Sequence, residues 1–517
     1  MPRSAAGVAS RLTLAVAVAA GLLAAPARAG SHDSRPTPIR SVDWRTYGHD
    51  LRHDFHGVTT LTPASVRTLA PAWFFPTGDA VTANPIVVAG IVYAGSWDGN
   101  FYAIDARTGA QRWKYVLKRQ PAVTPRPGEQ PRNPASDGGL VTSSAWFEPG
   151  DGKGRPDLVI FGGGYTMYAL VARTGALYWQ HDYTGRPDRP PNPATDEARI
   201  FSSPVVVGNR VLFGVTPDGQ NNHRGYVVGA DLRTGKPMWR FETDVNPKGK
   251  ILNDGCGGVW SSGTVMAKLG LVVFDVADCN FKDTPPYNER VFALRIADGK
   301  PAWIFNPPRP DPDCDWDFGA TANLGLAPDG TPTFLGVGGK DGTYYSLNPR
   351  TGRLRWHTNV VFGGLAGGFI ATTAYDGDHV VGATALGDFG RFEGFGSLFL
   401  CQPTNPRDNY IQEPSLHAFD AHTGKVLWQQ PLSQSFSATT IAGGMVFVGL
   451  AILKQVQVRS IHDGSLLTAL PLPADSQSGI VVSGNTLFFG TGSSEQGTPL
   501  GVYAYTPLGE APSNAGR

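Results

Sequence analysis

The sequence predicts an all-β protein, an eight-bladed β-propeller of four-stranded antiparallel blades closed by an N-terminal strand that completes the last blade. Two observations indicate an all-β chain. It carries 65 Gly and 42 Pro in 517 residues, and both residue types weaken helix interiors. A short turn phrase also recurs along almost its whole length, as expected of a repeat architecture. Because 41% of the residues are hydrophobic and 12 are Trp, the chain can also build a core.

The first 29 residues have the composition of a secretory signal peptide. Arg3 and Arg11 give a positive start, Leu12 to Ala25 is apolar, and Ala27-Arg28-Ala29 offers a cleavage site. We therefore expect a secreted or periplasmic protein and no membrane span. The expected divisions are 1–29 signal peptide, 30–68 N-terminal segment, 69–510 propeller and 511–517 flexible tail.

The repeated phrase consists of an Asp-like residue, two further residues, Thr-Gly, three residues and a Trp. The first copy runs from Asp105 to Gly109 and continues to Trp113. Asp and Gly favour a tight turn between two strands, and the Trp supplies a large apolar surface for packing between units. Five further copies keep the same Gly-to-Trp spacing, and a degenerate seventh lacks the Trp: Gly175/Trp179, Gly235/Trp239, Gly299/Trp303, Gly352/Trp356, Gly424/Trp428 and Gly464.

The spacing of the repeats predicts eight units arranged in a ring. We expect innermost strands near residues 86, 141, 203, 262, 321, 369, 438 and 480. Radial closure protects strand edges that an open row would expose. The last unit ends at the strand Val502 to Tyr505 without a Trp-bearing fourth strand, and the segment Leu69 to Gly78 contains one. The sequence therefore predicts that residues 70–76 complete the last blade.

Composition argues against several partners. The net charge is +1 and only 17% of residues are charged, so neither a nucleic acid nor a membrane surface is expected to bind. No C-x-x-C-H haem motif occurs. The four cysteines predict structural disulfides in an exported chain, and sequence does not choose among the three pairings: Cys256, Cys279, Cys314 and Cys401.

The phrase A-x-D-x-x-T-G-x-x-x-W resembles the repeat of pyrroloquinoline quinone (PQQ) enzymes, the quinoprotein alcohol dehydrogenases. Trp44 to Asp50 and Val92 to Gly99 resemble that family too, and the polyvinyl-alcohol dehydrogenase-like branch is the most similar. The resemblance covers 44–505. It implies an alcohol substrate oxidised by hydride transfer to PQQ, and a separate electron acceptor such as a cytochrome c.

The resemblance assigns roles to three residues. Trp260, in Gly257-Gly-Val-Trp260, matches the tryptophan on which PQQ stacks. Asp317, in Asp315-Trp-Asp317-Phe-Gly319, matches the general base, and Lys340 matches a cation near the quinone oxygens. Relatives that use lanthanides have an acid at the position of Gly319, so calcium is the expected ion.

The expected calcium ligands depart from the family pattern. The family uses a Glu and an Asn, and the matching segments here place Asp278, or Asn280, at the Asn position. No Glu stands at the other position, where Asp218 is the nearest acid and also fits a Pro-Asp-Gly turn. The adjacent cysteine pair of many relatives is missing as well, and a Cys256–Cys279 bridge at the channel is a hypothesis.

These departures keep a second hypothesis open, a non-catalytic PQQ-like propeller that acts as a protein- or polymer-binding scaffold. A glycan-binding or hydrolytic propeller lacks a supporting carboxylate pair in the sequence. His49, His53 and His56 have no clear set of metal-binding partners, and we expect them to be surface or turn residues.

Overall fold

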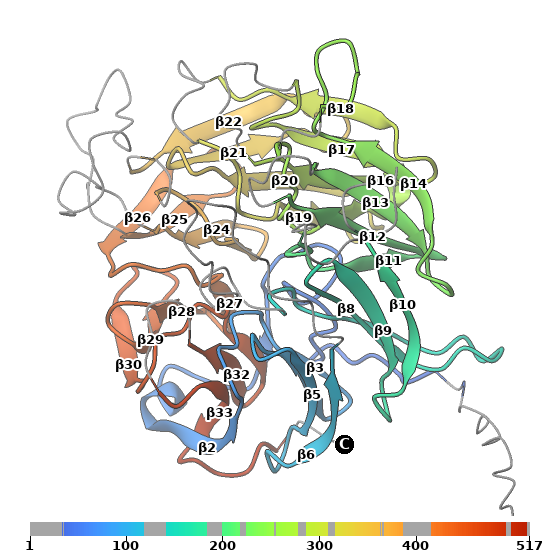
Figure 1. Cartoon of the computed structure of the whole chain (residues 1–517). Coiled ribbons are helices and arrows are strands. Elements are labelled where there is room, and N and C mark those ends of the chain that lie inside the picture. The colour runs from blue at the N-terminus through green and yellow to red at the C-terminus, as the bar shows by residue number, and fades with distance from the viewer. Residues whose placement is uncertain are drawn as a thin grey trace, which may run out of the picture.

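The computed structural model describes residues 34, 36–117, 141–183, 199–217, 224–252, 255–277, 286–308, 316–361, 363, 367–385, 415–492 and 498–513. Within these residues the chain forms eight β-sheets, and Figure 1 shows the sheets arranged in a ring. The predicted all-β, eight-bladed propeller is confirmed. No helix in the described part of the chain is long and apolar enough to cross a membrane.

Seven of the eight described sheets are four-stranded and antiparallel, and successive strands pair as neighbours. From the inner to the outer strand the blades are as follows: blade 1, β3(Ile86–Val88), β4(Ile91–Gly95), β5(Asn100–Asp105) and β6(Gln111–Val116); blade 2, β7(Trp146–Glu148), β8(Leu158–Gly163), β9(Thr166–Val171) and β10(Leu177–Asp182); blade 3, β11(Val205–Val207), β12(Arg210–Val215), β13(Tyr226–Asp231) and β14(Pro237–Glu242); blade 4, β15(Thr264–Met266), β16(Leu271–Asp275), β17(Val291–Arg295) and β18(Pro301–Phe305); blade 5, β19(Asn323–Leu326), β20(Pro332–Gly338), β21(Thr343–Leu347) and β22(Leu354–Asn359); blade 6, β23(Ala374–Tyr375), β24(His379–Ala383), β25(Ser415–Asp420) and β26(Val426–Pro431); blade 7, β27(Thr440–Ala442), β28(Met445–Leu450), β29(Gln455–Ser460) and β30(Leu466–Pro471). Short 3₁₀ turns lie at Ser65–Thr68 and Ala267–Leu269.

The eighth blade is built from both ends of the propeller. Its sheet has the order β1(Val58–Thr59), β31(Val481–Gly484), β32(Thr486–Thr491), β33(Gly501–Pro507) and β2(Leu69–Pro76). Strand β2 pairs antiparallel with β33 from Leu69↔Pro507 to Pro76↔Gly501. In Figure 1 the blue β2 lies beside the red β33. The predicted closure by residues 70–76 is therefore confirmed, and β1 adds a parallel fifth strand that was not expected.

The repeated Trp of one blade packs on the Thr-Gly turn of the next blade. Trp113 illustrates the contact: its indole Nε1 donates to the carbonyl of Ala172 at 2.9 Å, and a Cβ on Gly175 would lie 2.7 Å from its ring. Only a residue without a side chain fits at this turn, where Gly175 also has a φ of +71°. The same pairing joins these residues: Trp73/Gly109, Trp179/Gly235, Trp239/Gly299, Trp303/Gly352, Trp356/Gly424 and Trp428/Gly464.

The junction between blades 7 and 8 lacks this contact. Position 468 of blade 7 is Thr, where the other blades have Trp. In blade 8 the turn that would receive an indole is missing as well. Its third strand, β33, and its fourth strand, β2, come from opposite ends of the propeller sequence, so no turn joins them. The 3₁₀ turn Ser65–Thr68 lies there instead, and its Val66 packs in a hydrophobic cluster with residues of blades 7 and 8.

Residues 44–60, which we call the strap, run along the inner strands. Within the described chain, the strap makes backbone hydrogen bonds to the innermost strand of seven blades, among them Trp44 N to Val87 O (2.8 Å) and Tyr375 N to Asp54 O (2.8 Å). Trp44 is fully buried, and its Nε1 donates to Val482 O at 2.9 Å. The strap therefore ties blades together across the ring.

His53 was expected to be a surface or turn residue, and the turn is confirmed, because His53 N donates to Asp50 O at 3.2 Å. His53 is not a surface residue: it is fully buried, and its ring nitrogens lie 2.6 Å from Tyr47 O and 3.0 Å from Gly263 O. Burial lowers the pKa of His53, because the charged imidazolium would lose its hydration. The sequence gives no sign of this burial, since it results from the strap crossing blade 4.

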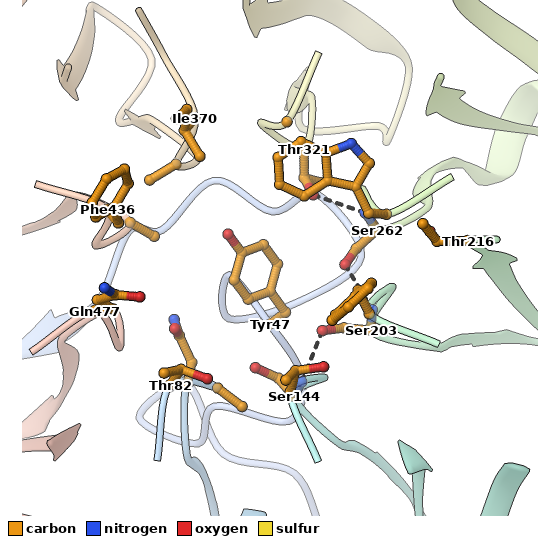
Figure 2. Close-up of a pocket in the computed structure, with 18 of the residues that line it drawn as sticks. Tyr47, Thr82, Ser144, Ser203, Thr216, Ser262, Thr321, Ile370, Phe436 and Gln477 are labelled. Carbon is orange, nitrogen blue, oxygen red and sulfur yellow. Dashed lines mark hydrogen bonds between the residues drawn. The ribbon is translucent and has the colours of Figure 1, made fainter. Parts of the chain in front are cut away.

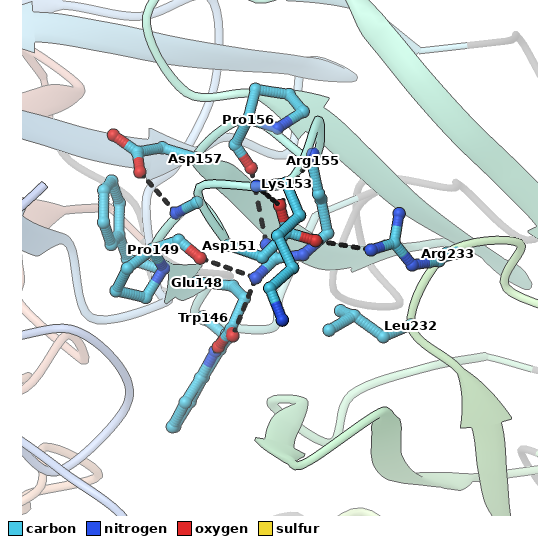
Figure 3. A network of polar contacts seen from close by, with 12 residues as sticks. Trp146, Glu148, Pro149, Asp151, Lys153, Arg155, Pro156, Asp157, Leu232 and Arg233 are labelled. Carbon is cyan, nitrogen blue, oxygen red and sulfur yellow. Dashed lines mark hydrogen bonds and ion pairs between the residues drawn. The ribbon is translucent and has the colours of Figure 1, made fainter. Parts of the chain in front are cut away.

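Polar contacts connect the end of β7 with the loop that follows it (Figure 3), and Arg45 of the strap contacts the same strand, β7. The guanidinium of Arg45 lies 4.2 Å from the centre of the Trp146 ring and 3.4 Å from Glu148 Oε2. Arg155 donates to Pro149 O at 2.6 Å and contacts the same carboxylate. At the blade 3 side, Arg233 forms an ion pair with Asp151.

Candidate functional site

The central channel contains a cavity of about 560 Å³, a size typical of small-molecule and cofactor sites. Each blade contributes from the segment that precedes its inner strand, and six blades contribute two residues that stand two positions apart in the chain, so that the wall has two tiers. Figure 2 shows the cavity with Tyr47 of the strap at its centre. The upper tier is Thr82, Thr142, Phe201, Trp260, Gly319, Ile370, Phe436 and Gln477, and the lower tier includes Asn84, Ser144, Ser203, Ser262, Thr321, Ala371 and Ala438.

A chain of hydrogen bonds runs around the lower tier. Each hydroxyl accepts from the backbone N–H of the preceding blade: Ser203 Oγ from Ser144 at 3.0 Å, Ser262 Oγ from Ser203 at 3.0 Å and Thr321 Oγ1 from Ser262 at 2.9 Å. Thr372 Oγ1 continues the chain by accepting from Thr321 at 2.9 Å. These bonds fix the cavity wall and satisfy amides that burial would otherwise leave unpaired.

The lower tier was missed in the sequence analysis, although the sequence carries a signal for it. A Ser-Ser pair recurs before the inner strands of blades 2, 3 and 4, at 143–144, 202–203 and 261–262, and Thr321 follows at the same interval of 59 residues. Small hydroxyl residues that recur at a fixed interval indicate equivalent positions in successive blades. The recurring Thr-Gly turns indicate equivalent positions in the same way.

Tyr47 was also missed, since it belongs to no repeat. Its hydroxyl donates to Thr372 Oγ1 at 2.9 Å. Burial raises the pKa of Tyr47 to about 12, so the phenol is neutral at physiological pH. The side chain therefore offers the cavity an aromatic surface and a neutral hydroxyl.

The structure brings two of the predicted site residues into this cavity, Trp260 and Asp317. Trp260 belongs to blade 4, where it stands two residues before Ser262 of the lower tier. Its indole extends towards blade 5, because a Cβ built on Gly319 would lie 2.6 Å from Cη2 of Trp260. The absence of a side chain at position 319 is thus what makes room for the indole.

The third predicted residue, Lys340, pairs with Asp317. Its Nζ lies 2.8 Å from Asp317 Oδ1, and both side chains are almost completely buried. The backbone supports the pair, since Lys340 N donates to Asp317 O at 2.9 Å. Lys340 stands in the tight turn between β20 and β21, where Gly342 adopts a φ of +75°. This turn lies against the segment that carries the carboxylate.

The predicted calcium ligands Asp218 and Asp278 lie outside the described residues, as does Asn280. Within the described ranges no group of three or more His, Cys, Asp or Glu side chains could hold a metal ion. Cys256 is in a disulfide. The other three cysteines also lie outside the described residues, so the Cys256–Cys279 hypothesis stays open.

The fold and this channel site define a β-propeller of the quinoprotein type. Residues 44–360 match the family described as "Glucose/ethanol/alcohol dehydrogenase, beta-propeller domain", and the chain belongs to that family. Residues 340–496 also match the family "Outer membrane protein assembly factor BamB". The predicted relationship to quinoprotein alcohol dehydrogenases is confirmed.

Curated relatives include quinohemoprotein alcohol dehydrogenase of Comamonas testosteroni, 27% identical over 60% of this chain and 44% of that protein. Polyvinylalcohol dehydrogenase of a Pseudomonas species is 26% identical over 67% of this chain and 55% of that protein. The chain thus spans about half the length of these relatives. A solved structure of quinohemoprotein alcohol dehydrogenase ADHIIG from Pseudomonas putida superposes with a TM-score of 0.70, 18% identity and coverage of 92% of this chain and 81% of that one.

Proposed function

We propose that this chain is a PQQ-dependent alcohol dehydrogenase. The observation that carries the proposal is the buried Asp317–Lys340 ion pair beside Trp260 in the channel cavity. An ion pair removed from water costs desolvation energy and adds little stability by itself. A buried carboxylate that borders a cavity is suited to accept a proton from a bound substrate.

The cavity fits PQQ in size and chemistry. The Trp260 indole presents a planar surface for a planar quinone. Two buried polar atoms that have no partner, Asn84 Nδ2 and Thr216 Oγ1, belong to residues of the cavity wall and could bind the polar edge of a cofactor. When bound, PQQ supplies the acceptor for the hydride of the alcohol. Calcium is proposed from the family alone, with Asp278 and Asp218 as its ligands.

Asp317, Lys340 and Trp260 then have different roles in the reaction. Asp317 accepts the hydroxyl proton of the alcohol while the C–H hydrogen leaves as hydride, so that the alcohol becomes a carbonyl compound. Lys340 holds the carboxylate in place, and its positive charge favours negative charge that develops on neighbouring oxygens. Trp260 would provide the flat surface against which a planar cofactor could stack.

The relatives support proposals for the substrate, the electron acceptor and the compartment. Polyvinylalcohol dehydrogenase among them supports a polymeric or secondary alcohol. A relative named "Lupanine 17-hydroxylase [cytochrome c]" supports a separate cytochrome c as electron acceptor. Together with the signal-like residues 1–29, the relationship supports export to the periplasm or beyond.

The test is reconstitution of the purified chain with PQQ and calcium, with an artificial dye as electron acceptor and secondary alcohols as substrates. We expect PQQ to quench Trp fluorescence and turnover to follow. Asp317→Asn is expected to keep the quenching and to lower kcat roughly 10²- to 10⁴-fold. Asp378→Asn, in the turn between β23 and β24 of blade 6, is the matched control, since the side chain of Asp378 is exposed to solvent. Absence of both quenching and turnover in the wild-type protein would exclude the proposal.

The second candidate is a scaffold propeller without catalysis. The match of residues 340–496 to the BamB family favours it, as does a superposition on BamB from Moraxella catarrhalis with a TM-score of 0.55. This candidate predicts no PQQ binding and the same partner binding in wild-type and Asp317→Asn protein.

A further inference from the structure

The wall of the channel cavity changes in polarity around the ring. Every blade except blades 6 and 7 contributes at least one hydroxyl, amide or carboxyl side chain to the described wall. In Figure 2, Ile370 and Phe436 lie at one side of the cavity, and Ser144 and Ser203 lie across from them. The described contribution of blades 6 and 7 is entirely apolar, and we call it the apolar wall: Ile370, Ala371, Phe436 and Ala438.

The apolar wall adjoins the segment that carries Asp317. The carbonyl oxygen of Ile370 lies 3.1 Å from the place that a Cβ on Gly319 would take, two residues after Asp317. Thr321 N donates to Thr372 Oγ1 at 2.9 Å and so joins the same two segments. These contacts hold blade 6 against blade 5, and the apolar wall therefore begins beside the carboxylate.

The hydroxyls that flank Phe436 donate within the protein. Ser435 Oγ donates to Gly449 O at 2.8 Å, and Ser437 Oγ donates to Ser478 O at 2.9 Å. Neither serine belongs to the cavity wall. A ligand at this side of the cavity therefore meets hydrocarbon and finds no hydroxyl donor.

Ile370 and Phe436 keep part of their surface exposed, although both residues stand in the wall of an interior cavity. Contact between apolar surface and water is unfavourable, and a ligand that covers such surface gains binding free energy in proportion to the area buried. The apolar wall is therefore suited to bind the hydrocarbon part of a ligand.

The other neighbour of blade 5 is blade 4, and the proposed function places the cofactor there, against Trp260. An alcohol that gives its proton to Asp317 beside a cofactor in that position has its carbon substituents on the opposite side of Asp317. That side is the apolar wall. This step rests on the proposed function.

We propose that the apolar wall binds the alkyl substituent of the alcohol, with Ile370 and Phe436 as specificity-determining residues, and that the substrates are secondary alcohols with a hydrocarbon chain. Poly(vinyl alcohol) carries a hydroxyl on every second carbon. A second hydroxyl placed against the apolar wall would lose its hydration without gaining a partner there, which is unfavourable. The wall thus favours alkyl alcohols over the polymer.

The first measurement is binding to the full chain without added PQQ, because this binding does not depend on turnover. The probes are 2-propanol, 2-pentanol and 2-octanol, observed by ligand NMR. We expect the affinity to rise roughly threefold for each added CH₂ group until the wall is covered. As a fragment of the polymer, 2,4-pentanediol is expected to bind roughly tenfold more weakly than 2-pentanol.

The second measurement uses variants of the wall. Phe436→Ser is expected to weaken the binding of 2-octanol roughly tenfold and to leave that of 2-propanol within about twofold. Phe201→Ser is the matched control, since Phe201 is a partly exposed residue of the same tier in blade 3, four blades away. Should Phe436→Ser not fold, Ile370→Thr replaces it. In the reconstituted enzyme, the same loss should appear in KM, with kcat within about threefold.

Three results would overturn the proposal: no dependence of wild-type affinity on chain length, equal losses in Phe436→Ser and Phe201→Ser, or a preference for 2,4-pentanediol over 2-pentanol. The last would favour the polymer as substrate. A failure of the proposed function looks different, since PQQ quenching and turnover of every alcohol would then be absent while the chain-length dependence of binding persists.

Discussion

The indole of Trp260 occupies the space that a side chain at Gly319 would need. A Cβ on Gly319 would lie 2.6 Å from Cη2 of Trp260 and 3.1 Å from the carbonyl oxygen of Ile370. Real Cβ atoms do not approach other atoms as closely as the first distance, so one of the two groups would have to move. An acid at position 319 is therefore incompatible with this indole orientation.

Gly319→Ala is accordingly expected to displace the indole. Overpacking of this kind costs roughly 1–3 kcal/mol, and the stacking surface would be lost with it. We expect a lower Tm and a PQQ affinity at least tenfold weaker, measured by fluorescence quenching. Gly325→Ala is the control, since its Cβ would lie equally close, 2.6 Å, to Tyr375 Oη but away from the cavity, so that it should lower the Tm and leave the PQQ affinity unchanged. Unchanged affinity in Gly319→Ala would show that Trp260 does not stack on the cofactor.

Substitutions in the Asp317–Lys340 pair are expected to lower the free energy of unfolding as well as the activity. Lys340→Met leaves a buried carboxylate without its counterion, and Asp317→Asn leaves a buried ammonium. Each single change is expected to cost about 3–5 kcal/mol of unfolding free energy, because the partner is left charged in a dry site. The double variant should be more stable than either single one. Additive losses in urea unfolding would contradict the coupling.

The inter-blade tryptophans should contribute strongly to stability. Trp179 is 7% exposed, and its Nε1 donates to Leu232 O at 2.8 Å. Trp179→Ala removes this bond and leaves a cavity against the turn at Gly235, with an expected cost of about 3–5 kcal/mol. Thr468→Ala changes the equivalent position at the junction that has no Trp, and should change the unfolding free energy by less than about 1 kcal/mol. Chemical unfolding measures both.

Acid is expected to destabilise the propeller through His417. Burial lowers the pKa of His417 to about 3, and its Nε2 lies 3.0 Å from Ser415 Oγ. The unfolded chain binds a proton below about pH 6.5 and the folded chain does not, so stability is complete above that pH and falls below it. One such group accounts for about 1.4 kcal/mol per pH unit.

His417→Gln should therefore flatten the acid slope of the unfolding free energy between pH 6 and pH 4, measured by urea unfolding at each pH. His422→Gln, on an exposed turn, serves as the control and should keep the wild-type slope. An identical slope in His417→Gln and wild type would show that other groups cause the acid sensitivity.

The repeat made the fold predictable, because the residue types in each copy favour a tight turn followed by a strand. The Thr-Gly turns and their Trp residues are read directly from spacing, and the incomplete last unit indicated closure by residues 70–76. The path of the strap was not predictable, because Trp44, Tyr47 and His53 belong to no repeat and their contacts span hundreds of residues.

The site was predictable only in part. Trp260, Asp317 and Lys340 were found by resemblance, and the structure places the first two in one cavity and pairs the last two. Tyr47 could not be found in this way, since it belongs to no repeat and reaches the cavity through the path of the strap.

The pairing of β2 with β33 also constrains when the protein can become native. A chain made from its N-terminus presents β2 early, and its partner is the last strand to appear. Until then, the edges of β2 and of the growing row of blades stay unpaired, and unpaired edges are sites of aggregation. Contacts between such distant residues also form slowly. We therefore expect the propeller to depend on protection of its early blades during synthesis or transport, more than a protein of similar size built from local contacts.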